Sequence, residues 1–254
     1  MVRVGVVFAV LFCGILAVGV PTCLAGENEL LRLIELADRR YAEVQDYTSV
    51  MLSIERVGEE LLPLQRIALK FQRPFQVYMR WLDGPSKGRE GLYVAGSHGG
   101  KFLVAEPSGL SRFFTAYLEP GDRRVMEKSR HPITDVGIGR LLEIVGENAR
   151  RAVREGALRV VDQGVQEVAG RRVRKIESVL PQDPAAGYYG YRVQLFFDEE
   201  HHLPIRVVVY DWKDRLVEDY TQSHLVLNPG LTPRDFDPRN VEYGFNSWRF
   251  RISG

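Results

Sequence analysis

The stretch Leu69–Val94, LKFQRPFQVYMRWLDGPSKGREGLYV, decides the fold predicted for this chain. Apolar and polar residues alternate on both sides of Arg73-Pro74, and such alternation with aromatic and β-branched residues is typical of strands. Proline cannot donate a hydrogen bond to a strand ladder, so Arg73-Pro74 marks the break between two strands. The loop at 83–88 then leads into a third strand, Gly91–Ala95. The stretch therefore predicts an antiparallel meander with one large apolar face.

The rest of the chain continues this pattern in both directions. In Tyr47–Val57, the residues Val50, Leu52 and Ile54 form one apolar face of a strand. The tail Pro229–Gly244 is rich in Pro and Asp, and we expect an irregular segment docked by aromatic side chains. Other strands are predicted from Leu62 into the quoted stretch and at Lys101–Ala105, Leu110–Phe114, Arg159–Val168, Arg171–Leu180, Tyr189–Asp198, Pro204–Tyr210 and Leu216–Leu227.

Two segments have helical rather than strand periodicity. Glu29–Gln45 and Pro132–Ala152 both carry apolar residues at i, i+3, i+4 and i+7, with charged residues opposite. The second helix contains three glycines, each of which costs about 1 kcal/mol relative to Ala, so we expect it to be loosely held. The residues thus predict a mainly β fold with helices (α+β), built from about eleven strands.

Length and charge limit the classes of protein. The chain has 254 residues, which suits one large or two small domains, and no repeat or linker divides it. We therefore expect a single domain over residues 26–254. The net charge of +1 comes from interleaved acids and bases, whereas nucleic-acid binding needs a clustered basic face, so no nucleic-acid partner is expected.

The N-terminus has the layout of a secretory signal peptide, residues 1–25. Arg3 precedes an uncharged run that ends in small residues, with a plausible cleavage position after Ala25. Cleavage is favoured, and retention as a membrane anchor or lipidation at Cys23 are the alternatives. The segment predicts a periplasmic or otherwise exported protein of the cell envelope. Cys13 and Cys23 both lie in it, so the mature chain would have neither disulfides nor thiol chemistry.

No motif predicts catalysis. Residues 199–202, EEHH, have the composition of a metal site but lie between two predicted strands, where they make a polar turn. Ser97-His98 lies in a glycine-rich turn that does not match the G-x-S-x-G nucleophile pattern. We therefore expect no enzyme, no metal and no cofactor, and an exported hydrolase is the weakest hypothesis.

Short motifs resemble the bacterial outer-membrane lipoprotein carriers of the LolA and LolB type. Lys70–Phe75 (KFQRPF) and Leu231–Pro238 (LTPRDFDP) look like carrier segments. Val77–Trp81 through Gly88–Tyr93 is more similar to an uncharacterised family of exported bacterial proteins placed near those carriers. Over residues 28–245, the resemblance implies a strongly curved, unclosed antiparallel sheet, or half-barrel. Its concave face would be covered by the N-terminal and mid-chain helices and would receive acyl chains.

The resemblance also implies roles for particular residues and partners. The expected ligand is a lipid or an acylated protein, with a membrane or envelope protein as a further partner, and the chain is expected to be a monomer. An open sheet needs its apolar face covered, and a helix of low stability suits ligand entry. The alternative is an envelope structural or interaction module with a filled core and no ligand. The expected cavity wall is Phe71, Met79, Trp81, Val193, Leu195 and Val207, and the lid is Ile138, Leu141, Leu142 and Val145. Arg73 and Arg80 are the candidates for a head-group or lid contact, and a solvated strand edge is the alternative for them.

Overall fold

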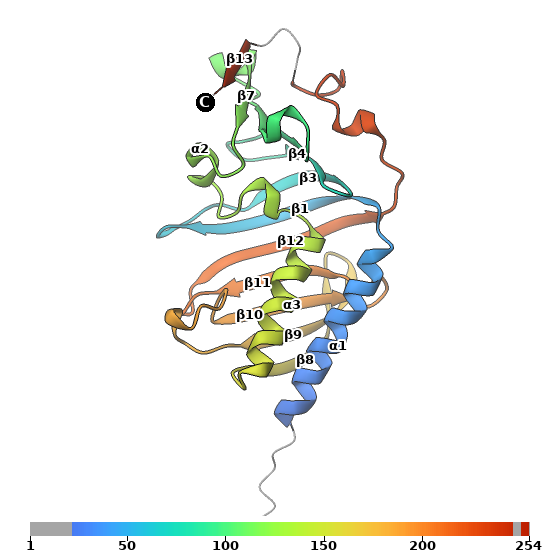
Figure 1. Ribbon diagram of the computed structural model, residues 1–254, viewed down its shortest axis with the longest axis vertical. Coiled ribbons are helices and arrows are strands. Elements are labelled where there is room, and N and C mark those ends of the chain that lie inside the picture. The colour runs from blue at the N-terminus through green and yellow to red at the C-terminus, as the bar shows by residue number, and fades with distance from the viewer. Residues whose placement is uncertain (1–21, 246–249, 254) are drawn as a thin grey trace, which may run out of the picture.

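The computed structural model describes residues 22–245 and 250–253, and their strands form one sheet (Figure 1). Twelve of the thirteen described strands follow the path β13-β7-β6-β5-β4-β3-β1-β12-β11-β10-β9-β8, and β2 pairs only with β1. Only β13 with β7 is a parallel pair among them. The strands are β1 (Asp46–Val57), β2 (Glu60–Leu61), β3 (Gln65–Gln72), β4 (Gln76–Trp81), β5 (Glu90–Val94), β6 (Phe102–Ala105), β7 (Phe114–Leu118), β8 (Arg159–Val168), β9 (Arg171–Val179), β10 (Arg192–Asp198), β11 (Pro204–Tyr210), β12 (Leu216–Leu227) and β13 (Phe250–Ser253).

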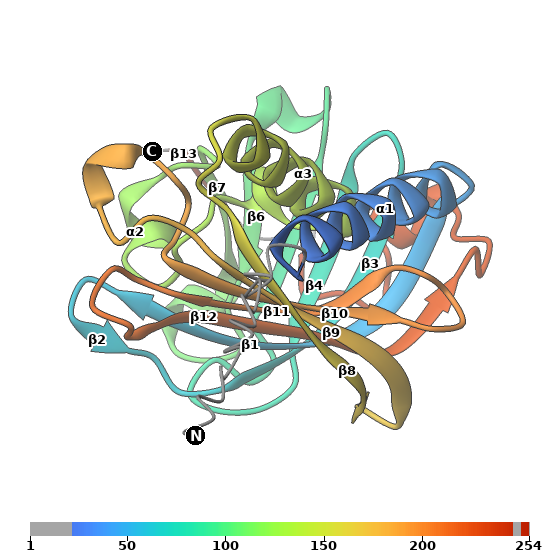
Figure 2. The same ribbon diagram turned by 90° about the horizontal axis from the view of Figure 1, so that it is seen from below.

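The strand order explains why helices cover one face. Two meanders, β1 to β7 and β8 to β12, meet where β1 pairs with β12. Strands β7 and β8 are consecutive in the chain but lie toward opposite edges, so their connection must cross the sheet. That connection contains α2 (Arg123–Met126) and α3 (Ile138–Arg154). Helix α1 (Thr22–Ala42) lies beside α3 on the same concave face, as Figures 1 and 2 show.

The predicted fold class is confirmed, with changes at several boundaries. Most of the predicted signal peptide lies outside the described residues, which begin with α1 at Thr22. The strand predicted at Leu110–Phe114 is wrong in position, because a 3-10 helix occupies Leu110–Phe113 and β7 follows it. A positive φ of 72° at Gly109 turns the chain into that helix. Strands β2 and β13, α2 and the short 3-10 turns were not predicted.

Helix α3 starts later than predicted because Gly137 interrupts the helical backbone with φ 122°. The three glycines of this region make close contacts. A Cβ atom on Gly139 would lie 2.4 Å from Cε1 of Tyr41 on α1, so glycine permits this approach of the two helices. The Ile138 N–H donates to the Tyr47 hydroxyl at 3.2 Å. The start of α3 is therefore fixed against α1 and the sheet, in contrast to the loose helix that its glycine content suggested.

The C-terminal tail packs on the opposite face of β4, β5 and β6, as its aromatic residues predict. The rings of Tyr78 and Tyr243 stack with centroids 4.0 Å apart. Lys70 donates to the Asp235 carboxylate at 2.7 Å and to the Tyr243 hydroxyl at 3.1 Å. Phe236 and Phe245 are buried in the same cluster. This tail covers the convex face at β4 to β6 and forms a small cluster there, separate from the core between the concave face and its helices.

Candidate functional site

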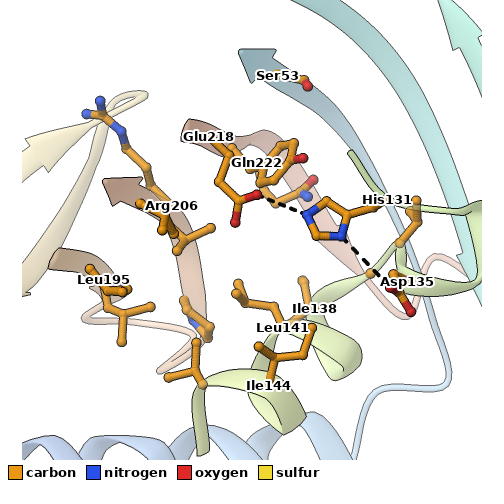
Figure 3. Close-up of a pocket in the computed structure, with 18 of the residues that line it drawn as sticks. Ser53, His131, Asp135, Ile138, Leu141, Ile144, Leu195, Arg206, Glu218 and Gln222 are labelled. Carbon is orange, nitrogen blue, oxygen red and sulfur yellow. Dashed lines mark hydrogen bonds and ion pairs between the residues drawn. The ribbon is translucent and has the colours of Figure 1, made fainter. Parts of the chain in front are cut away.

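A cavity of about 180 Å³ lies between the concave face of the sheet and α3. At roughly 10–15 Å³ for each water-sized group, it has room for about a dozen such groups. Figure 3 shows Leu195 of the sheet and Leu141 and Ile144 of α3 around this space. Eight of the residues expected in the wall or lid line the cavity, namely Met79, Trp81, Val193, Leu195, Val207, Ile138, Leu141 and Val145.

The other four predicted residues lie elsewhere. Phe71 stacks on Tyr47 with centroids 5.1 Å apart, and Leu142 is buried in the same core beside the cavity. The Arg73 guanidinium donates to backbone carbonyls at the end of α1, the shortest at 3.2 Å to Ala42. Arg80 follows the strand alternation to the convex face, where its side chain is 52% exposed. Neither arginine therefore belongs to the cavity.

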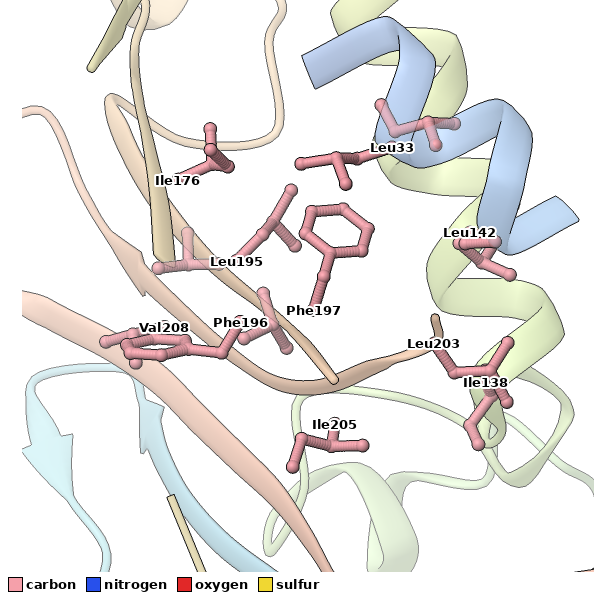
Figure 4. Packing of buried hydrophobic residues seen from close by; sticks show 14 of the residues in the cluster. Leu33, Ile138, Leu142, Ile176, Leu195, Phe196, Phe197, Leu203, Ile205 and Val208 are labelled. Atoms are coloured by element: carbon pink, nitrogen blue, oxygen red, sulfur yellow. The ribbon is translucent and has the colours of Figure 1, made fainter. Parts of the chain in front are cut away.

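Part of the space between the helices and the sheet is filled. Figure 4 shows Leu33 of α1 beside Phe197 of β10, and Leu203 beside Ile138 of α3. All four side chains are buried. The concave side thus contains a packed core next to α1 and an open cavity bounded by α3.

Polar side chains cross the floor of this cavity where β1 meets β12. We call them the polar band: Ser53 and Glu55 on β1, and Glu218 and Tyr220 on β12. The strand register places Glu55 directly opposite Glu218, and Ser53 opposite Tyr220. Glu55 is only 7% exposed and Glu218 only 4%. Opposed carboxylates repel each other, and buried carboxylates need hydrogen-bonding partners, so this pair requires compensation.

The compensation comes from two tyrosines and from the loop before α3. The hydroxyl of Tyr189 donates to Glu218 at 2.8 Å, and that of Tyr220 donates to Glu55 at 2.7 Å. The Arg130 backbone N–H donates to Glu55 at 2.7 Å. In the contact drawn in Figure 3, Nε2 of His131 lies 2.9 Å from Oε2 of Glu218. One loop therefore contacts both carboxylates.

The environment of this network raises the pKa values of its histidine and of its two tyrosines. Burial of the His131 ring opposes its protonation, but the hydrogen bond and charge of Glu218 outweigh burial, and the pKa of His131 is raised above its usual value. Burial, with Glu218 and Glu55 nearby, raises the pKa of Tyr220 far above its usual range. Tyr220 is consequently a neutral hydrogen-bond donor at physiological pH, and His131 carries its charge over a wider pH range than a free histidine.

The sequence analysis did not find the polar band because it considered only the apolar face of β1, and the helices cover the other face. Met51, Ser53 and Glu55 face the cavity, whereas the more apolar face with Val50, Leu52 and Ile54 is only half-buried. Period-two alternation identifies two faces but does not show which one the helices cover.

A buried polar atom without a partner also lies in the cavity wall. The hydroxyl oxygen of Ser178 is buried and has no hydrogen-bonding partner.

The EEHH segment forms a turn, in which the Asp198 carboxylate accepts from the N–H of His201 at 2.6 Å. Among the described residues, no group of three or more His, Cys, Asp or Glu side chains could hold a metal ion. None of the helices within 22–245 is long and apolar enough to cross a membrane.

Comparison with known proteins establishes the family. The family described as "Protein of unknown function (DUF1571)" matches residues 44–245, which is most of the chain, and the chain belongs to this family. No curated protein matches it.

Solved structures share the fold at low identity. Lipoprotein LppX of Mycobacterium tuberculosis is 14% identical, with 83% of this chain and 99% of that chain covered and a TM-score of 0.50. LprF of Mycobacterium bovis is also 14% identical, with 81% and 95% covered and a TM-score of 0.45. MucB, in the MucA/MucB complex of Pseudomonas aeruginosa, is 16% identical, with 84% and 60% covered and a TM-score of 0.46. The likeness to LppX confirms the expected relationship at the level of fold alone.

Proposed function

We propose that this protein is a non-enzymatic binding or carrier protein of the cell envelope that holds a lipid or the acyl chain of a lipoprotein. The observation that carries this proposal is the cavity between the concave sheet and α3. Its walls are mainly aliphatic, with Leu141, Val193 and Leu195 among them, and the polar band forms one part of its floor. Apolar pockets with a few fixed polar groups suit amphiphilic ligands.

The proposal also includes export of the protein from the cytoplasm. Removal of residues 1–25 would release residues 26–254 as a single domain into the periplasm or another compartment outside the cytoplasm. We expect a monomer that receives its ligand from a membrane or an acylated envelope protein.

Titration with a dansyl-labelled fatty acid tests the proposal. We expect saturable fluorescence enhancement, and a loss of affinity of at least about tenfold in Leu141→Asp, because a carboxylate in an apolar wall is poorly solvated. Glu147→Gln is the matched control, since Glu147 lies on the exposed side of α3 and should leave binding unchanged. Equal binding by Leu141→Asp and the unaltered chain would exclude the cavity as the site.

A second candidate function rests on the packed core next to α1. If the chain used only this core and its sheet, it would be an envelope structural or interaction module without a ligand. In that case the dye would show no saturable binding to the unaltered chain.

A further inference from the structure

We propose that access to the cavity is controlled by residues 128–136, the gate segment, which Arg130 and His131 attach to the buried pair Glu55 and Glu218. This inference rests on the proposed function, because a gate matters only if a ligand enters. It assigns the opening movement to this segment and a stationary role to α3.

Helix α3 is poorly suited to lift away from the sheet. Gly139 lets Tyr41 of α1 pack directly against the α3 backbone, and Ile138 is hydrogen-bonded to the buried Tyr47. Further along the helix, Ala149 and Ala152 are buried at 6% and 0% exposure. Movement of α3 would therefore break apolar contacts along most of its length.

The gate segment forms part of the cavity rim. Ser129, His131 and Val136 line the cavity, whereas Lys128 at the rim is exposed and the Arg130 side chain is 32% exposed. Ile133 is the buried apolar side chain of the segment, at 4% exposure. Segments with few buried apolar contacts open before the core does, so polar contacts must carry much of the closure.

These polar contacts join the gate segment to the two central strands. The Arg130 backbone N–H donates to the Glu55 carboxylate at 2.7 Å. Nη1 of the Arg130 side chain donates to the Arg56 carbonyl at 3.1 Å. The Arg130 Nε lies 3.5 Å from Glu218, and the His131 Nε2 lies 2.9 Å from the same carboxylate. The opposed carboxylates, unfavourable by themselves, thus obtain their cationic partners from a surface loop. Opening the segment would remove these partners from the acid pair and expose it to solvent.

The closure should depend on pH through His131. The groups that face its ring are Glu218 and Tyr220 from β12, Glu55 from β1, Tyr189 ahead of β10, and Asp135 and Arg130 from its own segment. Asp135 is itself paired with Arg140 of α3 at 3.3 Å.

A raised folded pKa means that the stabilisation by His131 is complete below its unfolded value of about 6.5. It is lost as pH rises through the folded value. The gate segment should consequently open more often at pH 9 than at pH 6.

Hydrogen exchange of the full chain tests the gate without any ligand. After correction for intrinsic exchange rates, we expect amides 129–136 to lose protection by about tenfold in His131→Gln and Glu218→Gln at pH 6. The amides of α3 should keep their protection, and Glu147→Gln should behave as the unaltered chain. Unchanged protection of 129–136, or an equal loss throughout α3, would overturn the inference.

Stopped-flow release of the dansyl-labelled fatty acid tests the link to access. Release should be about tenfold faster in His131→Gln, and the double variant with Glu218→Gln should be no faster than Glu218→Gln alone, because the Glu218 substitution already removes the His131 contact. Release rates unchanged by either variant would refute control by the gate. In a further outcome, hydrogen exchange shows the expected opening while the dye binds neither the variants nor the unaltered chain. That combination would refute the proposed function and leave the contact between the gate segment and the carboxylates supported.

Discussion

Replacement of Glu218 by Gln should destabilise the protein more at pH 6 than at pH 9. Glu218 is 4% exposed and accepts hydrogen bonds from Tyr189 at 2.8 Å and from His131 at 2.9 Å. Gln keeps one acceptor oxygen but loses the charge. The variant should lose one charge-assisted hydrogen bond, so its free energy of unfolding should fall by about 2–3 kcal/mol at pH 6.

The pH dependence follows from the raised pKa of His131 in the folded state. A group of this kind stabilises the fold fully below its unfolded pKa of about 6.5 and progressively less as pH rises through the folded value. The unaltered chain should therefore lose stability between pH 6 and pH 9. In Glu218→Gln the carboxylate that raises the pKa is gone, and this loss should largely disappear.

Urea unfolding at both pH values measures the effect through the transition midpoint and its slope. The control is Glu147→Gln, which removes an exposed carboxylate from α3 and should follow the unaltered chain. The same pH dependence in Glu218→Gln and in the unaltered chain would refute the role of the His131–Glu218 pair.

Three further pairs of substitutions test the packing. Ser178→Ala removes a buried hydroxyl without a partner and should be neutral or stabilising by about 1 kcal/mol, whereas Ser223→Ala breaks a 2.8 Å hydrogen bond to the Val50 carbonyl and should cost about 1 kcal/mol in urea unfolding. Gly139→Val should lower the free energy of unfolding by about 2–3 kcal/mol, because the new side chain would collide with Tyr41. Gly121→Ala, which adds a methyl group in open space, should leave the melting temperature unchanged. Phe236→Ala should cost about 3–5 kcal/mol by emptying the cluster under the tail, and Val241→Ala, at 82% exposure, should leave thermal unfolding unchanged.

The strands that the sequence predicted best are those with strong alternation and clear turns. The prediction at Pro204–Tyr210 and that at Leu216–Leu227 match β11 and β12 at both ends. The strand at Leu110–Phe114 was misplaced, because apolar residues in a 3-10 turn resemble a short strand when only their order is considered.

The apolar part of the cavity was largely predictable, but the polar band was not. Residues such as Val193 and Leu195 are apolar and alternate along the chain, so the neighbouring sequence is enough to predict that they share one face of a strand. The opposition of Glu55 and Glu218 depends on the pairing of β1 with β12, which joins residues more than 160 positions apart. His131 lies in an irregular loop, and nothing in its neighbours along the chain indicates that it contacts both a distant strand and a cavity.

The glycines of the mid-chain helix show a second limit of sequence reasoning. Helix propensity assigns each of them a cost, which suggested a loosely held helix. The structure shows that Gly139 permits contact with Tyr41, a packing benefit that depends on a neighbouring helix. Propensity alone therefore omits the contacts that attach α3 to its neighbours.

Native mass spectrometry of the chain purified without detergent is the decisive measurement for a ligand in the cavity. We expect an adduct of lipid mass on the unaltered chain and its loss in Val193→Trp, which fills the cavity from β10. The matched variant Val161→Trp places the same side chain at a half-exposed position on β8 and should keep the adduct. A bare protein mass, unchanged by added phospholipid, fatty acid or acylated peptide, would contradict lipid binding, and an adduct that persists in Val193→Trp would contradict its placement in this cavity.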